Sequence, residues 1–321
     1  MKRFPLTVLT AALALAPLLG HAQAFPEKPI TFVVPFAAGT ATDQIARALG
    51  TQITAETKQA VVIDNRAGAS GFIASQNVAK APADGYTVLI TTNTTHAANE
   101  HLFKKLPYDP VKDFSPVAAL GKGGQIMVVN PTFPAKSVAE FIALAKKEPG
   151  KYSFGSGSSS SRMAGELLQQ MADIKLLHVP YKSNTLAVTD LLGGQINMMI
   201  TDTATGLPQV KAGKLRALGF SSSTRSALAP DVPTIAEAGV KGYEMGYWFA
   251  AYAPAKTPPA VVKRLNGLLV KAAKSEAAKT AFYEPTGTEV FTSSPEELGK
   301  FQAGESQKWG RIVKAAGIEA E

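Results

Sequence analysis

Two short segments rich in small and hydroxyl-bearing residues offer the most chemistry in this sequence. The first, residues 37–43 (AAGTATD), follows an apolar run and precedes a helical pattern. The second, residues 155–162 (GSGSSSSR), lies between a predicted strand and a predicted helix. Because the first N–H groups of a helix lack intrahelical partners and carry partial positive charge, both segments suit the binding of an anion. Two such segments would fit a ligand with a carboxylate at each end.

Both segments also have a purely structural interpretation. Residues 37–43 fit a strand–helix turn in which Thr42 or Asp43 caps the helix. Residues 155–162 fit a flexible loop that leaves Arg162 in solvent. In the binding interpretation, Arg162 instead gives a carboxylate two parallel hydrogen bonds. The residues alone leave both interpretations open.

The common signatures of catalysis and of metal binding are missing. The patterns G-x-S-x-G, G-x-x-x-x-G-K-[ST] and G-x-G-x-x-G do not occur, and the chain has no cysteine. His96 and His101 are five residues apart, which is the wrong spacing for a metal-binding pair on one helix face, and His178 fits a strand in the core. We therefore expect no catalytic residue, no metal and no cofactor, and we keep an exported hydrolase only as a weak alternative.

The elements that must position these segments alternate between strand and helix patterns. Apolar runs predict strands at 30–36, 61–63 and 86–91, and a helical pattern follows each of them. A second series of the same kind starts with a strand at 126–129, continues with a helix that Ser137 caps, and includes a helix from Arg162 to Met171. Two long amphipathic helices are expected at 258–282 and 295–316. This alternation predicts an α/β fold of mostly parallel sheets flanked by helices.

The length of the chain predicts two domains. Its 321 residues exceed what one core usually serves, and 45% of them are hydrophobic. We expect the chain to cross between domains in two glycine-rich regions, near 120–125 and 242–246. Residues 25–124 together with 246–321 would form one domain, and residues 125–245 the other. Trp248 follows the second crossing, where it fits either a wall of a cleft or packing at a hinge.

The first 24 residues have the pattern of a secretory signal peptide. Two basic residues precede an apolar stretch at 6–19, and residues 22–24 (AQA) give the small-x-small cleavage pattern. The stretch is shorter than the about 20 residues that span a membrane, so we expect cleavage after Ala24 and a periplasmic protein, with an uncleaved anchor as the alternative. The net charge of +8 is spread along the chain without basic–aromatic clusters, so we expect no nucleic-acid partner.

Short segments in a fixed order along the whole chain after residue 24 resemble the Bug family, the periplasmic receptors of tripartite tricarboxylate transporters. The matching segments are 28–30 (KPI), 33–36 (VVPF), 64–66 (DNR), Gly68, 83–87 (ADGYT), 106–110 (LPYDP), 112–114 (KDF), 178–182 (HVPYK), 190–195 (DLLGGQ), 211–218 (KAGKLRAL) and 230–234 (PDVPT). Several of them would be weak alone, but together they span nearly 300 residues.

The resemblance implies a two-domain Venus-flytrap fold that closes on a small carboxylate and then docks on the membrane subunits of a transporter. It implies a monomer that does no chemistry on its ligand. The loop from Phe36 to Asp43 would hold one carboxylate through backbone amides and water, and the loop from Ser156 to Arg162 would contribute from the other domain. The candidate ligand contacts are Phe36, Ala38, Gly39, Thr40, Asp43, Asn93, Ser156, Ser158, Ser159, Arg162, Asp202 and Trp248.

Four positions depart from the family pattern and bear on the ligand. Thr40 replaces a glycine, Arg162 a histidine and Ser183 a glycine, while Thr201-Asp202 stands in place of an Asp-Asn pair. The added arginine favours a dicarboxylate, aliphatic or aromatic. An unpaired Asp202 carboxylate in the cleft would instead favour an amine or a hydroxyl group on the ligand. A ligand-loaded partner of a membrane signalling protein is the alternative function.

Overall fold

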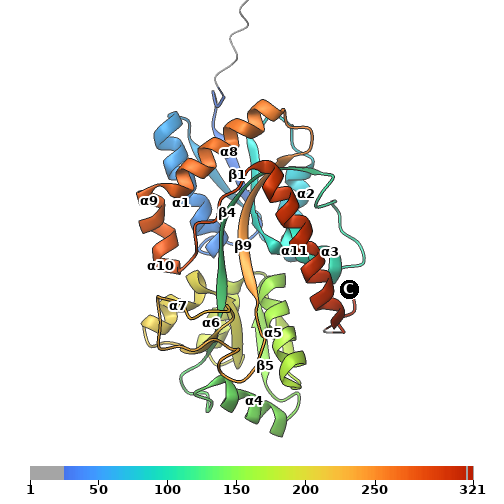
Figure 1. Cartoon of the computed structure of the whole chain (residues 1–321), viewed down its shortest axis with the longest axis vertical. Coiled ribbons are helices and arrows are strands. Elements are labelled where there is room, and N and C mark those ends of the chain that lie inside the picture. Colours follow the sequence, from blue (N-terminus) through green and yellow to red (C-terminus); the bar gives the residue numbers. More distant parts are fainter. Residues whose placement is uncertain (1–24, 316, 321) are drawn as a thin grey trace, which may run out of the picture.

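The computed structural model describes residues 25–320 apart from residue 316. The predicted signal peptide at residues 1–24 lies outside the described residues. Figure 1 shows two lobes, one above the other, joined by two long strands that run between them. None of the described helices is both long enough and apolar enough to cross a membrane.

The first lobe, lobe A, is built on one sheet with the strand order β2-β1-β3-β9-β4. Its strands are β1 (Ile30–Val34), β2 (Val61–Asn65), β3 (Thr87–Thr92), β9 (Gly246–Pro254) and the first part of β4 (Phe114–Val129). Its main helices are α1 (Ala41–Thr57), α2 (Phe72–Ala79), α3 (Asn99–Leu102), α8 (Pro259–Lys274) and α11 (Pro295–Ala315). A π-helical turn, η2 (Thr94–Ala98), precedes α3.

The second lobe, lobe B, continues from the end of β4 into a sheet of the same design. Its other strands are β5 (Ser153–Ser156), β6 (Leu177–Pro180), β7 (Met198–Asp202) and β8 (Arg216–Phe220). Its helices are α4 (Val138–Lys147), α5 (Ser159–Ala172), α6 (Asn184–Leu192) and α7 (Thr203–Lys211). The Ser137 side chain accepts the N–H of Glu140 and so caps α4, which confirms that sequence prediction.

Strands that belong to one lobe pair in parallel, whereas the strands that connect the lobes pair antiparallel. Strands β1, β2 and β3 pair in parallel, as do β5, β6 and β7, and each is followed by a helix as the sequence predicts. The crossing strands β4 and β9 pair antiparallel with each other and with their neighbours. The carboxyl ends of the parallel strands therefore meet between the lobes, where ligands bind in open α/β sheets.

The glycine-rich residues 120–125, where the sequence places the first crossing, lie inside one continuous strand. Strand β4 runs from Phe114 to Val129 and pairs first with β9 and then with β7 and β8. Its glycines serve close packing, since a Cβ atom at Gly123 would lie 2.5 Å from the hydroxyl oxygen of Tyr247. The residue boundaries of the two domains remain a prediction.

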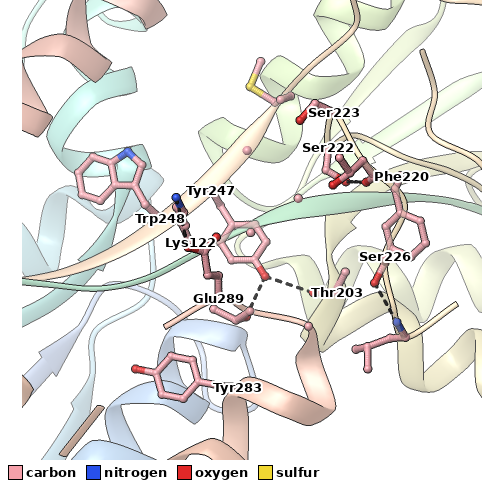
Figure 2. A pocket seen from close by; sticks show the side chains of 18 of the residues that line it. Lys122, Thr203, Phe220, Ser222, Ser223, Ser226, Tyr247, Trp248, Tyr283 and Glu289 are labelled. Carbon is pink, nitrogen blue, oxygen red and sulfur yellow. Dashed lines mark hydrogen bonds and ion pairs between the residues drawn. The ribbon is translucent and has the colours of Figure 1, made fainter. Parts of the chain in front are cut away.

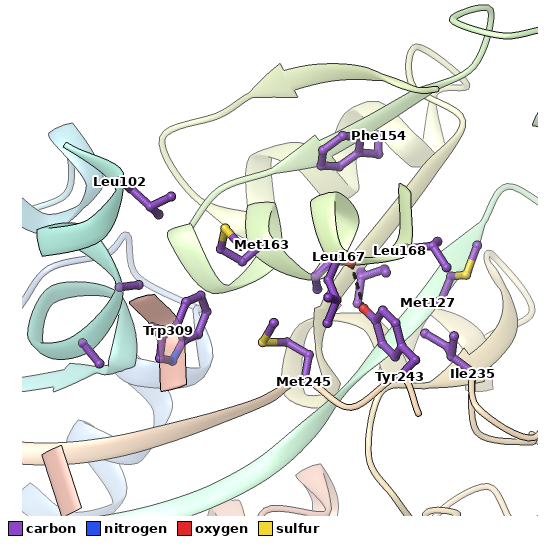
Figure 3. Packing of buried hydrophobic residues seen from close by; sticks show 14 of the residues in the cluster. Leu102, Met127, Phe154, Met163, Leu167, Leu168, Ile235, Tyr243, Met245 and Trp309 are labelled. Carbon is purple, nitrogen blue, oxygen red and sulfur yellow. Dashed lines mark hydrogen bonds between the residues drawn. The ribbon is translucent and has the colours of Figure 1, made fainter. Parts of the chain in front are cut away.

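The largest apolar cluster extends through both lobes. In Figure 3, Trp309 of α11 lies near Met163 of α5 and Leu102 of α3, with Met245 beside them. All four side chains are at most 1% exposed. The lobes are thus packed together in a closed arrangement.

The long helix expected at 258–282 is interrupted. Helix α8 ends at Lys274 because Ser275 adopts an extended conformation with φ −69° and ψ 144°. Ser275 then caps a new short helix by accepting the N–H of Ala278, so the polypeptide turns here instead of continuing straight.

Candidate functional site

The Tyr247 side chain lines two hollows. The smaller has a volume of about 40 Å³, lies between the lobes and is the less open of the two, so we call it the enclosed cavity; the other is an open groove of about 800 Å³. The enclosed cavity is lined by Phe36, Thr40, Ala41, Thr42, Thr92, Gln125, Gly157, Ser158, Ser160, Asn184, Asp202, Tyr247 and Phe249. Asp202 is the one charged residue in this set, so the cavity wall offers an anion neutral hydrogen-bond donors and no cation.

The start of α1 brings backbone N–H groups to the cavity. Thr40 is the N-cap, but its hydroxyl donates to the carbonyl oxygen of Ala37 at 2.8 Å and does not cap the helix. Among the described residues, no hydrogen-bond acceptor is found for the N–H groups of Ala41 and Thr42. Both residues line the cavity, so the first turn of a 17-residue helix presents its free donors there.

A network of Asp43, Arg47 and Asn65 stabilises the loop that precedes α1. One oxygen of the Asp43 carboxylate accepts the N–H of Gly39 at 2.9 Å and the Nε–H of Arg47 at 3.0 Å, and the other forms an ion pair with the Arg47 guanidinium at 2.9 Å. Asn65 donates to the carbonyl oxygen of Phe36 at 3.0 Å and accepts from Arg47 at 3.3 Å. Burial by itself raises the pKa of Asp43, but the hydrogen bonds from Arg47 and Gly39 outweigh burial and leave that pKa below its usual value.

The start of α5 brings hydroxyl groups to the opposite side of the cavity. The helix begins at Ser159, three residues earlier than the sequence predicted, because Ser158 acts as its N-cap and accepts the N–H of Ser161 at 3.2 Å. The segment is therefore a capped helix start and not a flexible loop. Ser158 and Ser160 both line the cavity.

Two hydroxyl contacts of α5 reach across to lobe A. Ser159 donates to the Asn99 side-chain oxygen at 2.7 Å, and the Ser160 hydroxyl lies 3.3 Å from that of Thr94. Both contacts hold the start of α5 against the start of α3 and η2. They form part of the closed arrangement of the lobes.

The Asp202 carboxylate accepts hydrogen bonds from residues of its own lobe. One carboxylate oxygen accepts the backbone N–H and the hydroxyl of Thr205 at 2.8 and 2.7 Å, which caps α7. The other accepts the Asn184 amide at 3.0 Å, and Asn184 in turn accepts the N–H of Gly157 at 2.9 Å. The carboxylate that lines the cavity is thus partnered, which removes the reason for treating it as a free anion that demands an amine.

The open groove has a different character. Figure 2 shows Trp248, Lys122 and Glu289 along it, with Tyr247 reaching toward Thr203. The Tyr247 hydroxyl lies 3.2 Å from that of Thr203 and 2.9 Å from that of Thr288. The ammonium group of Lys122 pairs with Glu289 at 3.4 Å. Burial raises the pKa of Tyr247 to about 12, so this hydroxyl stays protonated and joins lobe B to the C-terminal segment.

The structure places the predicted contact residues in three groups. Four of them line the enclosed cavity: Phe36, Thr40, Ser158 and Asp202. Six do not line it, although each is within three residues of one that does: Ala38, Gly39, Asp43, Asn93, Ser156 and Ser159. Asn93 is fully buried and donates to the carbonyl oxygen of Gly246, while the Ser156 hydroxyl lies 2.7 Å from Nε2 of His178.

The two remaining predicted residues lie elsewhere. The Trp248 indole N–H donates to Glu305 at 3.2 Å, and the ring lines the open groove. Arg162 is outside the cavity wall, where its Nε atom lies 3.8 Å from Glu166 in the next turn of α5. The expected arginine–carboxylate contact therefore has no support from this geometry.

Sequence reasoning missed several lining residues. Gln125, Asn184, Thr92 and Tyr247 come from elements whose spacing gives no sign of a shared cavity. Tyr247 and Asn184 each adjoin a position that the sequence did single out, but their side chains meet only through the packing of the two lobes.

The described residues contain no cluster of metal-binding side chains, and one of the histidines belongs to the core. They contain no group of three or more His, Asp or Glu side chains that could hold a metal ion. His96 is fully buried, stacks on Tyr252 with ring centroids 3.8 Å apart, and has its pKa lowered by burial to about 3. This imidazole is neutral and acts as part of the core.

Comparison with known proteins identifies the architecture. A family model described as the tripartite tricarboxylate transporter family receptor matches residues 45–318. BugT of Bordetella pertussis (strain Tohama I) is 35% identical over 315 residues, which cover 97% of this chain and 95% of BugT. The chain belongs to the Bug family of tripartite tricarboxylate transporter receptors.

Two solved structures extend this assignment of the Bug receptor to its fold. A protein of R. palustris solved with adipate is 34% identical, with a TM-score of 0.90 over 92% of this chain and all of the other. MatC of Rhodopseudomonas palustris, solved with bound malate, is 31% identical, with a TM-score of 0.86 over 90% of this chain and all of MatC. The family resemblance and the two-domain Venus-flytrap fold expected from the sequence are confirmed. Proteins of this family are solute-binding receptors that take small carboxylates and work with membrane transporter subunits.

Proposed function

We propose that this Bug receptor captures a small dicarboxylate in the enclosed cavity and delivers it, unchanged, to the membrane subunits of a tripartite tricarboxylate transporter. The observation that carries the proposal is the convergence of two helix starts, α1 from lobe A and α5 from lobe B, on one cavity. The α1 start supplies free N–H donors, the α5 start supplies hydroxyl donors, and the dipole of each helix favours one carboxylate. The adipate and malate of the two related structures are both dicarboxylates.

The size of the cavity favours a short ligand. Its 40 Å³ corresponds to the space of about three water molecules. An aliphatic acid of a few carbons needs a small separation of the lobes, whereas an aromatic diacid needs a larger one. We therefore favour short aliphatic dicarboxylates over aromatic ones.

Capture would follow from closure of the lobes. We place the moving units at residues 25–124 with 246–321 and at residues 125–245, so that the β4 and β9 connections act as the hinge. A ligand that touches both helix starts binds the closed form better than the open form and so shifts the population toward it. The receptor would act as a monomer in the periplasm after cleavage at Ala24.

A thermal-shift screen of the purified receptor tests the proposal. The panel contains aliphatic dicarboxylates of increasing length with the matching monocarboxylates, citrate, acidic amino acids, and benzoate- and phthalate-type acids. At about 1,000 times its Kd, a true ligand adds about 4 kcal/mol of stability, which raises Tm by several degrees. A shift with dicarboxylates and none with the matching monocarboxylates supports two-ended capture. Equal shifts with both would contradict it, as would no shift with any acid.

A further inference from the structure

Gln125 occupies the point where β4 passes from one lobe to the other. Its backbone is fixed there, because its N–H donates to the Ser221 hydroxyl at 2.6 Å and its carbonyl accepts the Ser221 N–H at 2.8 Å. The residue is 2% exposed and lines the enclosed cavity. The fixed backbone therefore holds the Gln125 side chain at the wall of the cavity.

The Gln125 side chain makes no hydrogen bond with any residue that the structure describes, and its buried amide oxygen has no partner. A buried polar group without a partner destabilises the folded protein, because its lost hydrogen bonds to water are not replaced. Other buried polar atoms without partners, such as Nε2 of His96 and the hydroxyl of Tyr252, belong to residues outside the cavity wall. At Gln125, by contrast, a bound molecule can supply the missing partner.

The strand register places Gln125 beside Asp202. The two residues are direct partners in the antiparallel pairing of β4 with β7, so their side chains leave the sheet on the same side. Both line the cavity. The Asp202 carboxylate is hydrogen-bonded within its own lobe, and a ligand carboxylate placed next to it would be repelled by a group of like charge.

The Asp202 carboxylate restricts which groups of a ligand can lie in its part of the cavity. The carboxylates of a ligand belong at the starts of α1 and α5, where uncharged donors converge. The part of the ligand that faces Gln125 and Asp202 must not be an anion and must be able to form hydrogen bonds. Because the Asp202 oxygens already accept hydrogen bonds from Asn184 and Thr205, a neutral polar group fits this position better than an ammonium group. A primary amide offers a donor and an acceptor side by side, and a hydroxyl group both accepts and donates.

We propose that Gln125, next to Asp202, recognises a hydroxyl group on the ligand, so that the preferred ligand is a hydroxy-dicarboxylate. This inference rests on the proposed function, since it assumes that the enclosed cavity holds a carboxylate. It adds a specificity-determining residue from the hinge to the donors of the two helix starts.

Matched ligand pairs test the role of the hydroxyl group. Isothermal titration calorimetry on the purified receptor compares malate with succinate, 2-hydroxyglutarate with glutarate, and citrate with its analogue that lacks the hydroxyl group. We expect the hydroxy acid of at least one pair to bind about 10–100 times more tightly than its partner. Aspartate serves as the probe for an ammonium group at the same position.

Gln125→Met tests the residue, because methionine has nearly the same shape and cannot replace the amide. We expect this variant to lose about 10–100-fold in affinity for the hydroxy acid and to keep its affinity for the matching plain acid within about twofold. Gln302→Met is the matched control. Gln302 is 5% exposed and donates to the carbonyl oxygen of Pro110, so its substitution should lower Tm without changing the preference between paired ligands.

Each other outcome contradicts the inference in a recognisable way. Equal binding of paired acids, tighter binding of aspartate, or an equal loss for both members of a pair in Gln125→Met would remove hydroxyl recognition from Gln125. Binding only of acids outside the pairs would do the same, and would leave the proposed function in place. Failure of every carboxylate to bind the unmodified receptor would overturn the proposed function itself.

Discussion

The starts of α1 and α5 face the same cavity but are stabilised in different ways. The α1 start is fixed within lobe A by ionic contacts that link Asp43, Arg47 and the backbone of Gly39. The α5 start is neutral, caps itself through Ser158, and sends the Ser159 hydroxyl across to Asn99 in lobe A. Only the second set of contacts depends on the lobes being closed.

This difference indicates that the two lobes contribute to ligand binding in different ways. Lobe A presents a preformed donor site whose geometry is independent of closure. Lobe B completes the site and gains contacts with lobe A at the same moment. Ligand binding and closure are then coupled mainly through α5.

The largest effect is expected from Gly157→Ala, at the loop that leads into α5. A Cβ atom there would lie 1.9 Å from the backbone carbon of Ser183, and backbone cannot yield as a flexible side chain can. We expect a loss of about 3 kcal/mol or more in stability, measured by chemical denaturation, together with loss of ligand binding. Gly267→Ala is the control, because Gly267 lies inside α8 with open space around its Cα, and this change should stabilise by up to about 1 kcal/mol. Equal tolerance of both changes would show that the loop is not tightly packed.

A smaller effect is expected from Asp43→Asn, which removes the charge at the α1 start. Because the folded pKa of Asp43 lies below its usual value of 3.8, its stabilising contribution is present above that value and is lost as the pH falls through the folded pKa. We expect the variant to be about 1–3 kcal/mol less stable than the wild type at pH 7, since Asp43 is 3% exposed and hydrogen-bonded. Denaturation curves at pH 7 and pH 3 should show this difference shrinking in acid. An equal stability difference at both pH values would show that the charge of Asp43 does not stabilise the α1 start.

Ser159→Ala separates closure from local folding. It removes the 2.7 Å hydrogen bond to Asn99 between lobes, so we expect about 1–2 kcal/mol weaker ligand binding and a less compact ligand-bound particle in small-angle scattering. Ser161→Ala is the matched variant, because that hydroxyl donates to the carbonyl oxygen of Ile200 within lobe B. It should lower Tm and leave ligand affinity nearly unchanged. The reverse pattern would place the closing contact elsewhere.

The smallest effect is expected from Arg162→Ala. Its position beside Glu166 and outside the cavity wall predicts a change in ligand affinity within about 0.5 kcal/mol. Calorimetry that found a loss above about 1.5 kcal/mol would return Arg162 to the ligand site, as the sequence alone suggested.

The alternation of apolar runs and helical patterns was enough to predict the strands around Ile30 and Val61 and the α/β class, because buried parallel strands have a strong local signal. Of the crossing strand β4, the sequence predicted only the end at 126–129, since the glycines before it look like a break between elements when their packing against Tyr247 is unknown. The extension of α5 back to Ser159 was also missed, because a run of serines fits a cap, a helix start or a loop equally well.

The candidate site was less predictable than the fold. The loop after Phe36 carries a local signal, a strand end followed by a helix start. Gln125 carries none, because its significance lies in the absence of a partner and in its register with Asp202. Such properties arise only when segments distant in sequence are brought together.

The placement of the two tryptophans gives the receptor a built-in optical reporter. Trp309 lies in the apolar cluster shared by α11 and α5, and Trp248 lies on the crossing strand β9 with its indole bonded to Glu305. The sequence contains no other tryptophan. Both indoles therefore sit where separation of the lobes would change their solvation, so intrinsic fluorescence should follow opening and closing in real time without any added label.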